Sequence, residues 1–295
     1  MGEEARHRHN FPALCRRPKE KPVKEVRTAS IDGLKAFGAR LIETGDLDPI
    51  YVALVGAQLD REQTKRWLLA YWMFYHAGFA SYASEREGSV FWAVIERAAY
   101  NLTESPVGGR WPRGTERRHF RGDKCVNAVG WFANQATPEY FVDRLSMPSG
   151  MGGYEVLTHK AVIARATRWP QFGPWIAFKV ADMLERCLGV PVAFSNEVAL
   201  LYKEPAKCLD ILYDVTATPT SDTYRDLEEW AMRMPAPPLL DRPCSHQEIE
   251  TVLCKYKSHL GGHYEVGKDT KELREGLEGW GKTAKKLLAA APVVV

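Results

Sequence analysis

The sequence predicts a mainly α-helical protein, and three observations support this fold class. Apolar residues recur at helical spacing along most of the chain. No regular alternation of short strands with helices is visible, and no internal repeat occurs. The 295 residues contain 45% hydrophobic and 26% charged side chains, as in a soluble globular protein with a buried core. We therefore expect one large or two modest helical domains.

The helix signals differ in strength along the chain. Ser30 can cap a first helix over 31–44, because its hydroxyl accepts free N–H groups of the first turn. The strongest pattern covers 63–84, where large apolar residues share one broad face without an interrupting proline. The apolar segment 51–59 fits a strand or a helix equally well. Further helices are expected over 91–101, 123–134, 138–145, 174–184, 205–213, 223–234, 246–260 and 269–290.

Composition divides the chain into three parts. Residues 1–25 mix basic, acidic and proline residues with few apolar ones, which predicts a flexible basic arm. Residues 26–268 form the expected helical domain, and 269–295 form a C-terminal helix and tail that contains Gly276, Gly279 and Gly281. No apolar run approaches the ~20 residues of a membrane span. Six cysteines without CxxC spacing indicate reduced thiols, so we expect a cytoplasmic protein.

A turn and helix over 169–184 form the stretch around which the chain is organised. Gly173 and Pro174 suit the start of a helix, and free amides at such a terminus attract phosphates. If 162–168 is also helical, the unit consists of a helix, a hairpin and a second helix. Such a unit indicates binding to a nucleic-acid backbone. Lys179 and Asp182 lie three residues apart, so they form a plain surface ion pair unless that side faces a cleft.

The second pattern is an arginine-rich block. Residues 110–124 contain six cationic side chains but only two acidic ones, Glu116 and Asp123, interleaved with Trp111, His119 and Phe120. Guanidinium groups bind phosphates in pairs of hydrogen bonds, and aromatic rings stack on unpaired bases. A solvated loop whose arginines pair with distant carboxylates is the alternative.

Two weaker patterns lie near the C-terminus. Lys255, Lys257, His259 and His263 beside a Gly-Gly turn could form an anion pocket, whereas the spacing to the nearby cysteines does not support a zinc site. Residues 276–283 satisfy the phosphate-loop pattern GxxxxGK[ST]. A charged, strandless segment precedes them and only twelve residues follow, so we reject a nucleotide site.

These stretches resemble a phage DNA-hypermodification family, the amino acid:DNA transferases, also described as α-glutamyl/putrescinyl thymine pyrophosphorylases. The resemblance runs from Tyr51 to Asp269. Its most specific pieces are 71–78 (YWMFYHAG), 110–122 (RWPRGTERRHFRG), 172–182 (FGPWIAFKVAD) and 255–260 (KYKSHL). It implies a helical relative of helix-hairpin-helix DNA glycosylases.

The resemblance also implies a reaction. The substrate is double-stranded DNA in which a separate kinase has pyrophosphorylated 5-hydroxymethyluracil. The amine of a free amino acid, glycine or glutamate, displaces pyrophosphate from the 5-methylene carbon. The expected partners are therefore DNA and a free amino acid, without a membrane. No cofactor is required by the pattern, and magnesium is left open.

Departing pyrophosphate needs cations, and the attacking amine needs a base. We assign pyrophosphate binding to Arg110, Arg113, Arg117 and Arg121. We assign catalysis to Glu116, Arg117, Arg118, His119 and Asp182. We assign substrate binding to Lys179, Asn196, Lys257 and His259. We assign DNA binding to Gln171, Gly173, Trp175, Lys124 and Lys255. No residue is assigned to a metal.

The hairpin departs from the glycosylase pattern. Gln171 replaces its first glycine, Trp175 stands where a lyase carries its lysine, and 193–196 (AFSN) lack the expected aspartate. The sequence therefore argues against base excision. The alternatives that stay open are a non-catalytic DNA-binding module, a helical partner of the hydroxymethyluracil kinase, and a true DNA glycosylase.

Overall fold

The computed structural model describes residues 28–147, 156–200, 202–213 and 222–293. The predicted N-terminal arm lies outside these residues. The described chain is mainly α-helical, as predicted, and its strands are only two residues long. The elements are α1 (Ile31–Glu43), α2 (Pro49–Gly56), α3 (Arg61–Phe74), α4 (Ala77–Ser84), α5 (Gly88–Tyr100), η1 (Thr115–Arg117), α6 (Gly122–Ala133), α7 (Pro138–Ser146), β1 (Leu157–Thr158), α8 (His159–Ala166), α9 (Pro174–Leu188), β2 (Val192–Ala193), η2 (Asn196–Leu200), α10 (Lys203–Tyr213), α11 (Asp222–Ala231), α12 (His246–Leu260), α13 (Lys268–Leu277) and α14 (Lys282–Ala290).

Local signals predicted most helix starts correctly. Ser30 caps α1 by accepting the N–H of Gly33 at 3.0 Å. The undecided segment 51–59 is helical as part of α2, which Pro49 opens. A capping box of Ser245 and Glu248 begins α12 at the predicted residue. Among the described residues, no helix is both long and apolar enough to cross a membrane.

The single helix predicted over 63–84 is wrong, because the chain breaks into α3 and α4. Tyr75 adopts a left-handed conformation with φ of 53°, and the His76 side chain then caps α4 by accepting the N–H of Phe79 at 3.1 Å. One left-handed residue and a polar cap therefore interrupt the helix there. Contacts of this break with the η1 turn outweigh the local helix propensity.

The single helix predicted over 269–290 is also wrong. Gly279 and Gly281 have positive φ and separate α13 from α14. The rejected phosphate-loop pattern falls on this turn, which a helix precedes instead of a strand. The N–H of Thr283 donates to the Glu85 carboxylate at 2.8 Å, so an acidic group occupies the end of the loop.

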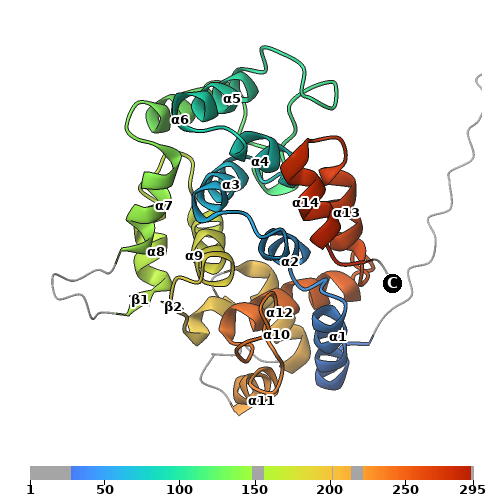
Figure 1. The fold of residues 1–295 in the computed structure, drawn as a ribbon. Helices are drawn as coiled ribbons and strands as arrows, with labels where there is room; N and C mark the ends of the chain where they lie inside the picture. Colours follow the sequence, from blue (N-terminus) through green and yellow to red (C-terminus); the bar gives the residue numbers. More distant parts are fainter. Residues whose placement is uncertain (1–27, 148–155, 201, 214–221, 294–295) are drawn as a thin grey trace, which may run out of the picture.

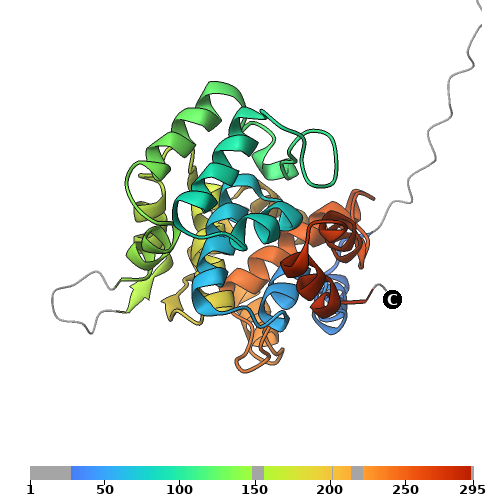
Figure 2. The same ribbon diagram turned by 45° about the horizontal axis from the view of Figure 1, so that its top comes forward.

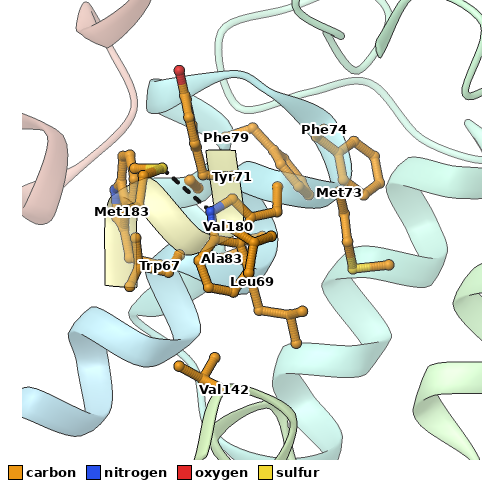
Figure 3. Packing of buried hydrophobic residues seen from close by; sticks show 14 of the residues in the cluster. Trp67, Leu69, Tyr71, Met73, Phe74, Phe79, Ala83, Val142, Val180 and Met183 are labelled. Carbon is orange, nitrogen blue, oxygen red and sulfur yellow. Dashed lines mark hydrogen bonds between the residues drawn. The ribbon is translucent and has the colours of Figure 1, made fainter. Parts of the chain in front are cut away.

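The described helices enclose two hydrophobic cores. The larger core is formed by α2 to α9 and by α13 and α14, and Figure 3 shows its centre, where Trp67, Met183 and Val180 pack together. The smaller core is formed by α1 and α10 to α12. In Figures 1 and 2 the C-terminal helices α13 and α14 (red) lie on the opposite side of the molecule from α7 and α8 (green).

The helix α9 runs between the two cores. Its apolar face, which includes Ile176, Val180 and Met183, belongs to the larger core. Its other face carries Lys179, Asp182 and Arg186, which are buried although they are charged. The helix α8, a short turn and α9 form the helix–turn–helix arrangement that the sequence suggested.

Gln171 takes a left-handed conformation in this turn, with φ of 64°. Such a conformation costs a residue other than glycine roughly 1–2 kcal/mol. We expect Gln171→Gly to stabilise the protein by about 0.5–1 kcal/mol, measured as the free energy of unfolding in urea. Gln171→Ala keeps the backbone penalty and serves as the control, so equal stability of the two variants would contradict the strain.

Candidate active site

A cavity of about 310 Å³ lies where the N-terminus of α2, the break between α3 and α4, the η1 turn and α13 meet. All four segments are far apart in the sequence, and Figure 1 shows α2 beside α13. The lining residues are Asp48, Pro49, Ile50, Tyr71, Tyr75, His76, Ala77, Gly114, Thr115, Glu116, Asp269, Glu272, Leu273 and Gly276.

A close backbone contact holds the η1 turn against the α3–α4 break. The N–H of Gly114 donates to the carbonyl of Phe74 at 2.9 Å. A Cβ atom at Gly114 would lie 2.0 Å from the carbonyl oxygen of Tyr75, so only glycine fits here. This contact explains why the helix breaks at Tyr75 and how Glu116 reaches the cavity.

Tyr71 and Tyr75 line the cavity and belong to a row of neighbouring aromatic rings. Trp67 stacks on Tyr71 with ring centroids 4.9 Å apart, Tyr71 lies 4.6 Å from Tyr75, and Tyr75 lies 5.2 Å from Trp175 at the start of α9. Burial raises the pKa of Tyr71 and Tyr75 well above the ordinary value, so both hydroxyls stay protonated. Flat rings with polar edges suit a planar, hydrogen-bonding ligand.

His76 presents a neutral hydrogen-bond donor to the cavity. Burial, together with the charge of Arg113, lowers the pKa of His76 to about 4. Its Nδ1 accepts the Phe79 N–H, so the proton of the neutral ring must lie on Nε2. No hydrogen bond of Nε2 occurs within the described part of the chain.

The opposite wall is acidic. Asp48 is neutralised by Arg186 at 2.6 Å, and Asp269 by Lys255 at 2.7 Å. Glu272 is exposed and lies 3.9 Å from Lys268. No lysine or arginine is among the described residues that line the cavity. The cavity therefore favours a cationic or amine-bearing ligand.

Glu116 is the carboxylate of this wall without an ion-pair partner in the described ranges. The residue is exposed at the cavity mouth, yet desolvation of its carboxyl raises its pKa above the ordinary value. Asp269 and Glu272 raise this pKa further, whereas Lys179 lowers it. A carboxylate with a raised pKa in a cavity suits a general base.

Lys179 and Asp182 form the predicted ion pair, at 3.4 Å, but inside the protein instead of on a surface. The Tyr51 hydroxyl also donates to Asp182, at 2.7 Å. Burial raises the pKa of Asp182 despite Lys179 and Arg186, and three carboxylates raise the pKa of Lys179. Asp182 is fully buried and does not line the cavity, so its contacts favour a structural role.

Glu250 of α12 faces this network and is buried. Burial raises its pKa from 4.5 to about 7, partly offset by Lys179. The folded protein therefore holds this proton more tightly than the unfolded chain. The stability that this proton contributes is fully present below about pH 4.5, and it is lost as the pH rises through 7.

We expect Glu250→Gln to be more stable than the parent by about 1–3 kcal/mol at pH 8, because glutamine removes a buried carboxylate. The difference should shrink towards pH 5. Urea unfolding across this pH range measures it. Glu43→Gln, at an exposed position of α1, is the matched control, and a pH-independent difference for Glu250→Gln would disprove the assignment.

Two arginines of the predicted block turn towards the protein, Arg117 buried and Arg113 half-buried. Arg117 donates from Nε to the carbonyls of Trp72 and Met73, and from Nη1 to the carbonyl of Gln171 at 2.6 Å. Burial lowers the pKa of Arg117 to about 10. Arg113 donates to several backbone carbonyls and stacks on a buried ring. These contacts favour structural roles, in which Arg117 ties the end of α3 to the hairpin.

The other cations of the block are exposed. Arg118 contacts only its neighbours, through the ring of His119 at 3.2 Å and the carbonyl of Thr115. Arg121 donates to the carbonyl of Arg118 at 3.1 Å. Neither forms an ion pair in the described ranges, and the same holds for Arg110, His119 and Lys124. The positive charges of Arg110, Arg118, Arg121 and Lys124 are therefore available to meet an anion.

The hairpin residues lie at the surface. Gln171 and Gly173 are exposed, nothing occupies the space beside Gly173, and Trp175 is half-buried against Tyr75. Asn196 begins η2, at the base of the α8–α9 unit. The hairpin thus remains a predicted DNA contact.

The three residues predicted from 255–259 lie elsewhere. Lys255 is largely buried and donates to Asp46, Tyr264 and Asp269. Lys257 pairs with Glu204, and His259 contacts the carbonyl of Tyr264 at 3.0 Å. None of the three lines the cavity. Lys255 alone among them contacts a lining residue, Asp269.

Most residues that line the cavity were not among the site residues predicted from the sequence. Tyr71, Tyr75 and His76 lie in the segment 71–78 (YWMFYHAG), one of the pieces that carry the family resemblance. That segment was the sequence signal that could have identified them. Asp269 and Glu272 have the pattern of a solvated helix face, and only the packing of α13 against α2 brings them to the cavity.

Taken together, a helical fold, a cavity with an unpaired carboxylate and an exposed arginine turn are typical of an enzyme that handles an anionic substrate. Comparison with known proteins agrees. Residues 26–264 match the sequence model of the amino acid:DNA transferase family.

Two phage proteins are similar over most of their length. A glycinyltransferase of Pseudomonas phage PaMx11 is 42% identical over 278 residues, covering 85% of this chain and 92% of that protein. A putrescinyltransferase of Delftia phage PhiW-14 is 29% identical over 268 residues, covering 86% and 81%. The chain therefore belongs to the amino acid:DNA transferase family and is an enzyme.

Proposed function

We propose that this enzyme transfers glycine, through its amine, onto the 5-methylene carbon of pyrophosphorylated 5-hydroxymethyluracil in DNA, and releases pyrophosphate. One observation carries the proposal. The η1 turn places Glu116 in the cavity and leaves Arg118, with the nearby Arg121, exposed outside it. A substitution needs this separation, with a base beside the nucleophile and cations beside the leaving group.

The bond changes follow from this arrangement. The lone pair of the neutral amine forms a C–N bond with the methylene carbon as the C–O bond to pyrophosphate breaks. The electron pair of that bond leaves with pyrophosphate, whose charge Arg118, Arg121 and Arg110 stabilise. The proton that the new secondary ammonium loses passes to the Glu116 carboxylate.

The cavity also offers a place for the amino acid. The acidic wall attracts its ammonium group, and the Nε2–H of His76 can donate to its carboxylate. Glycine is favoured because the more similar of the two relatives is a glycinyltransferase. The aromatic row of Tyr71, Tyr75 and Trp175 suits the flat face of the modified base, which must leave the duplex to react.

The α8–α9 hairpin supports a scaffold related to helix-hairpin-helix glycosylases but without base excision. Residues 193–196 lack a carboxylate, and the next one, Glu197, is exposed and pairs with Lys160 at 2.5 Å. A surface ion pair of this kind is poorly placed to stabilise a sugar cation. Incubation with hydroxymethyluracil DNA should therefore yield no abasic sites.

Magnesium is an open part of the proposal. Carboxylate oxygens of the kind that line the cavity are the ligands this ion prefers, and it would neutralise charge on pyrophosphate. Transfer measured with and without a chelator decides whether the ion takes part.

A diamine is the second candidate nucleophile. The part of the cavity wall that the structure describes has no lysine or arginine to receive a carboxylate, and the second relative is a putrescinyltransferase. The experiment that tests both is mass spectrometry of nucleosides from pyrophosphorylated hydroxymethyluracil DNA incubated with the protein and glycine, glutamate or putrescine. Pyrophosphate release without a new nucleoside would contradict the proposal.

We expect the double variant Arg118→Ala, Arg121→Ala to lower the transfer rate by about 10- to 100-fold. This loss lies below the ~10²–10³-fold effect of a buried donor, because both side chains are exposed to solvent. Arg40→Ala, an exposed arginine on the distant α1, is the control. A double variant with the parental rate would remove these residues from leaving-group binding.

A further inference from the structure

A second cavity, of about 420 Å³, lies beside the hairpin on the α7–α8 side of the molecule. It is separate from the proposed active site, which lies towards α13 (Figure 1). No carboxylate lines it in the described part of the chain. Its lining includes three arginines and two tryptophans, Arg144, Arg165, Arg168, Trp131 and Trp169.

The tryptophans form a rigid wall. Trp169 packs edge-on against Phe132 at 5.3 Å and Phe141 at 5.7 Å, and Trp131 contacts the same rings at 5.0 and 6.0 Å. Both tryptophans are half-buried, so part of each ring faces the cavity. Rings held in place by other rings lose little conformational entropy when a ligand stacks on them.

The arginines supply charge at the rim. Arg144 and Arg168 are exposed, and neither has an ion-pair partner among the residues that the structure describes. Arg165 donates to the carbonyl of Leu145 at 3.1 Å, which fixes the position of its guanidinium beside the cavity. Exposed arginines such as Arg144 and Arg168 next to aromatic faces are the combination that binds nucleotides.

The position of the cavity connects it to the other basic residues. Arg168 and Trp169 directly precede the hairpin turn, and Arg117 of the 110–124 block donates to the carbonyl of Gln171 within it. The hairpin turn is therefore in contact with the arginine-rich block and continuous in sequence with two residues that line this cavity. A DNA strand that crosses the hairpin would meet both.

We propose that this cavity binds one nucleotide of the DNA strand that flanks the modified base. Its base stacks on Trp131 and Trp169, and its neighbouring phosphates lie at Arg144 and Arg168. The inference rests on DNA as the substrate in the proposed function, but not on the chemistry in the active site. It adds a contact beyond the hairpin that would set the length of DNA required.

The test measures affinity for duplex DNA by fluorescence anisotropy over a range of salt concentrations. Arg144→Ala and Arg168→Ala should each weaken binding several-fold and reduce the slope of log affinity against log salt by about 1. Trp131→Ala should weaken binding about tenfold without changing the slope. Arg40→Ala on α1 is the matched control. Arginine variants with the affinity and slope of the control would overturn the proposal.

A second measurement tests base insertion. 2-Aminopurine is placed in turn at each position around a hydroxymethyluracil, and its fluorescence is followed on protein binding. We expect a change at one flanking position that Trp131→Ala abolishes. Arginine effects without any position-specific signal would overturn the nucleotide site and leave only a backbone contact. Transfer by the parent protein is measured alongside, so failure of the proposed reaction would appear there, separately from any change in DNA affinity.

Discussion

Replacing Glu116 with glutamine is expected to lower the rate of amine transfer by about 10²- to 10⁴-fold, the usual contribution of a general base. Glutamine keeps the size and polarity of the side chain but cannot accept a proton. Because Glu116 is exposed at the cavity mouth and has no ion-pair partner in the described ranges, the free energy of unfolding should not change by more than about 0.5 kcal/mol.

The pH dependence sharpens this prediction. Desolvation raises the pKa of Glu116, so its basic form is lost as the pH falls through that raised value, and transfer by the parent should fall with it. The glutamine variant should lack this limb of the profile. Glu43→Gln on α1 is the control and should retain the parental rate and profile. A Glu116→Gln variant within threefold of the parent would remove the residue from catalysis.

Replacing Arg186 with leucine should destabilise the protein by about 3–5 kcal/mol, the cost of leaving buried charges without their partner. Arg186 lies 2.6 Å from Asp48, 3.7 Å from Asp182 and 3.4 Å from Glu248, and it donates twice to the carbonyl of Pro237. Leucine fills part of the space but neutralises none of these carboxylates.

The loss should depend on pH in a defined direction. Arg186 is a main cause of the lowered pKa of Asp48, opposing burial, so its removal raises that pKa. The difference in the free energy of unfolding between the parent and the variant is therefore largest near pH 7, and it shrinks as acid protonates the carboxylates. Urea unfolding at several pH values measures it, with Arg40→Ala as a control expected within about 0.5 kcal/mol. The double variant with Asp48→Asn should recover part of the loss, and strict additivity would exclude coupling between the two side chains.

Helix positions and the arginine-rich turn could be predicted from the sequence because both depend on neighbours in the chain. Apolar spacing marks the buried face of a helix. Ser30 and the Ser245 capping box satisfy backbone groups locally, and Pro49 has no N–H to leave unpaired in the first turn of α2. The long helix predicted over 63–84 failed for the opposite reason, a contact with a distant part of the chain. The break at Tyr75 depends on Gly114, almost forty residues away, which alone permits the η1 turn to approach so closely.

The roles within the arginine block could not be separated from sequence. Six cations at similar spacing look alike, yet Arg113 and Arg117 donate to buried carbonyls while Arg118 and Arg121 remain exposed. Arg117 turns inward to the carbonyls of Trp72 and Met73 at the end of α3, and Arg113 to carbonyls that include that of Ala98 in α5, so the inward direction depends on elements outside the block. The predicted roles of the exposed residues stay predictions.

By itself, the sequence determined the helical class, the basic turn and the resemblance to the amino acid:DNA transferases, because these follow from composition and from short stretches of chain. Tertiary structure alone decided that Glu116 meets Tyr71, His76 and Asp269 in one cavity. It also decided that the charges of α9 lie buried between two cores. Both depend on helices that are distant in the sequence packing together, and no local pattern records which faces will meet.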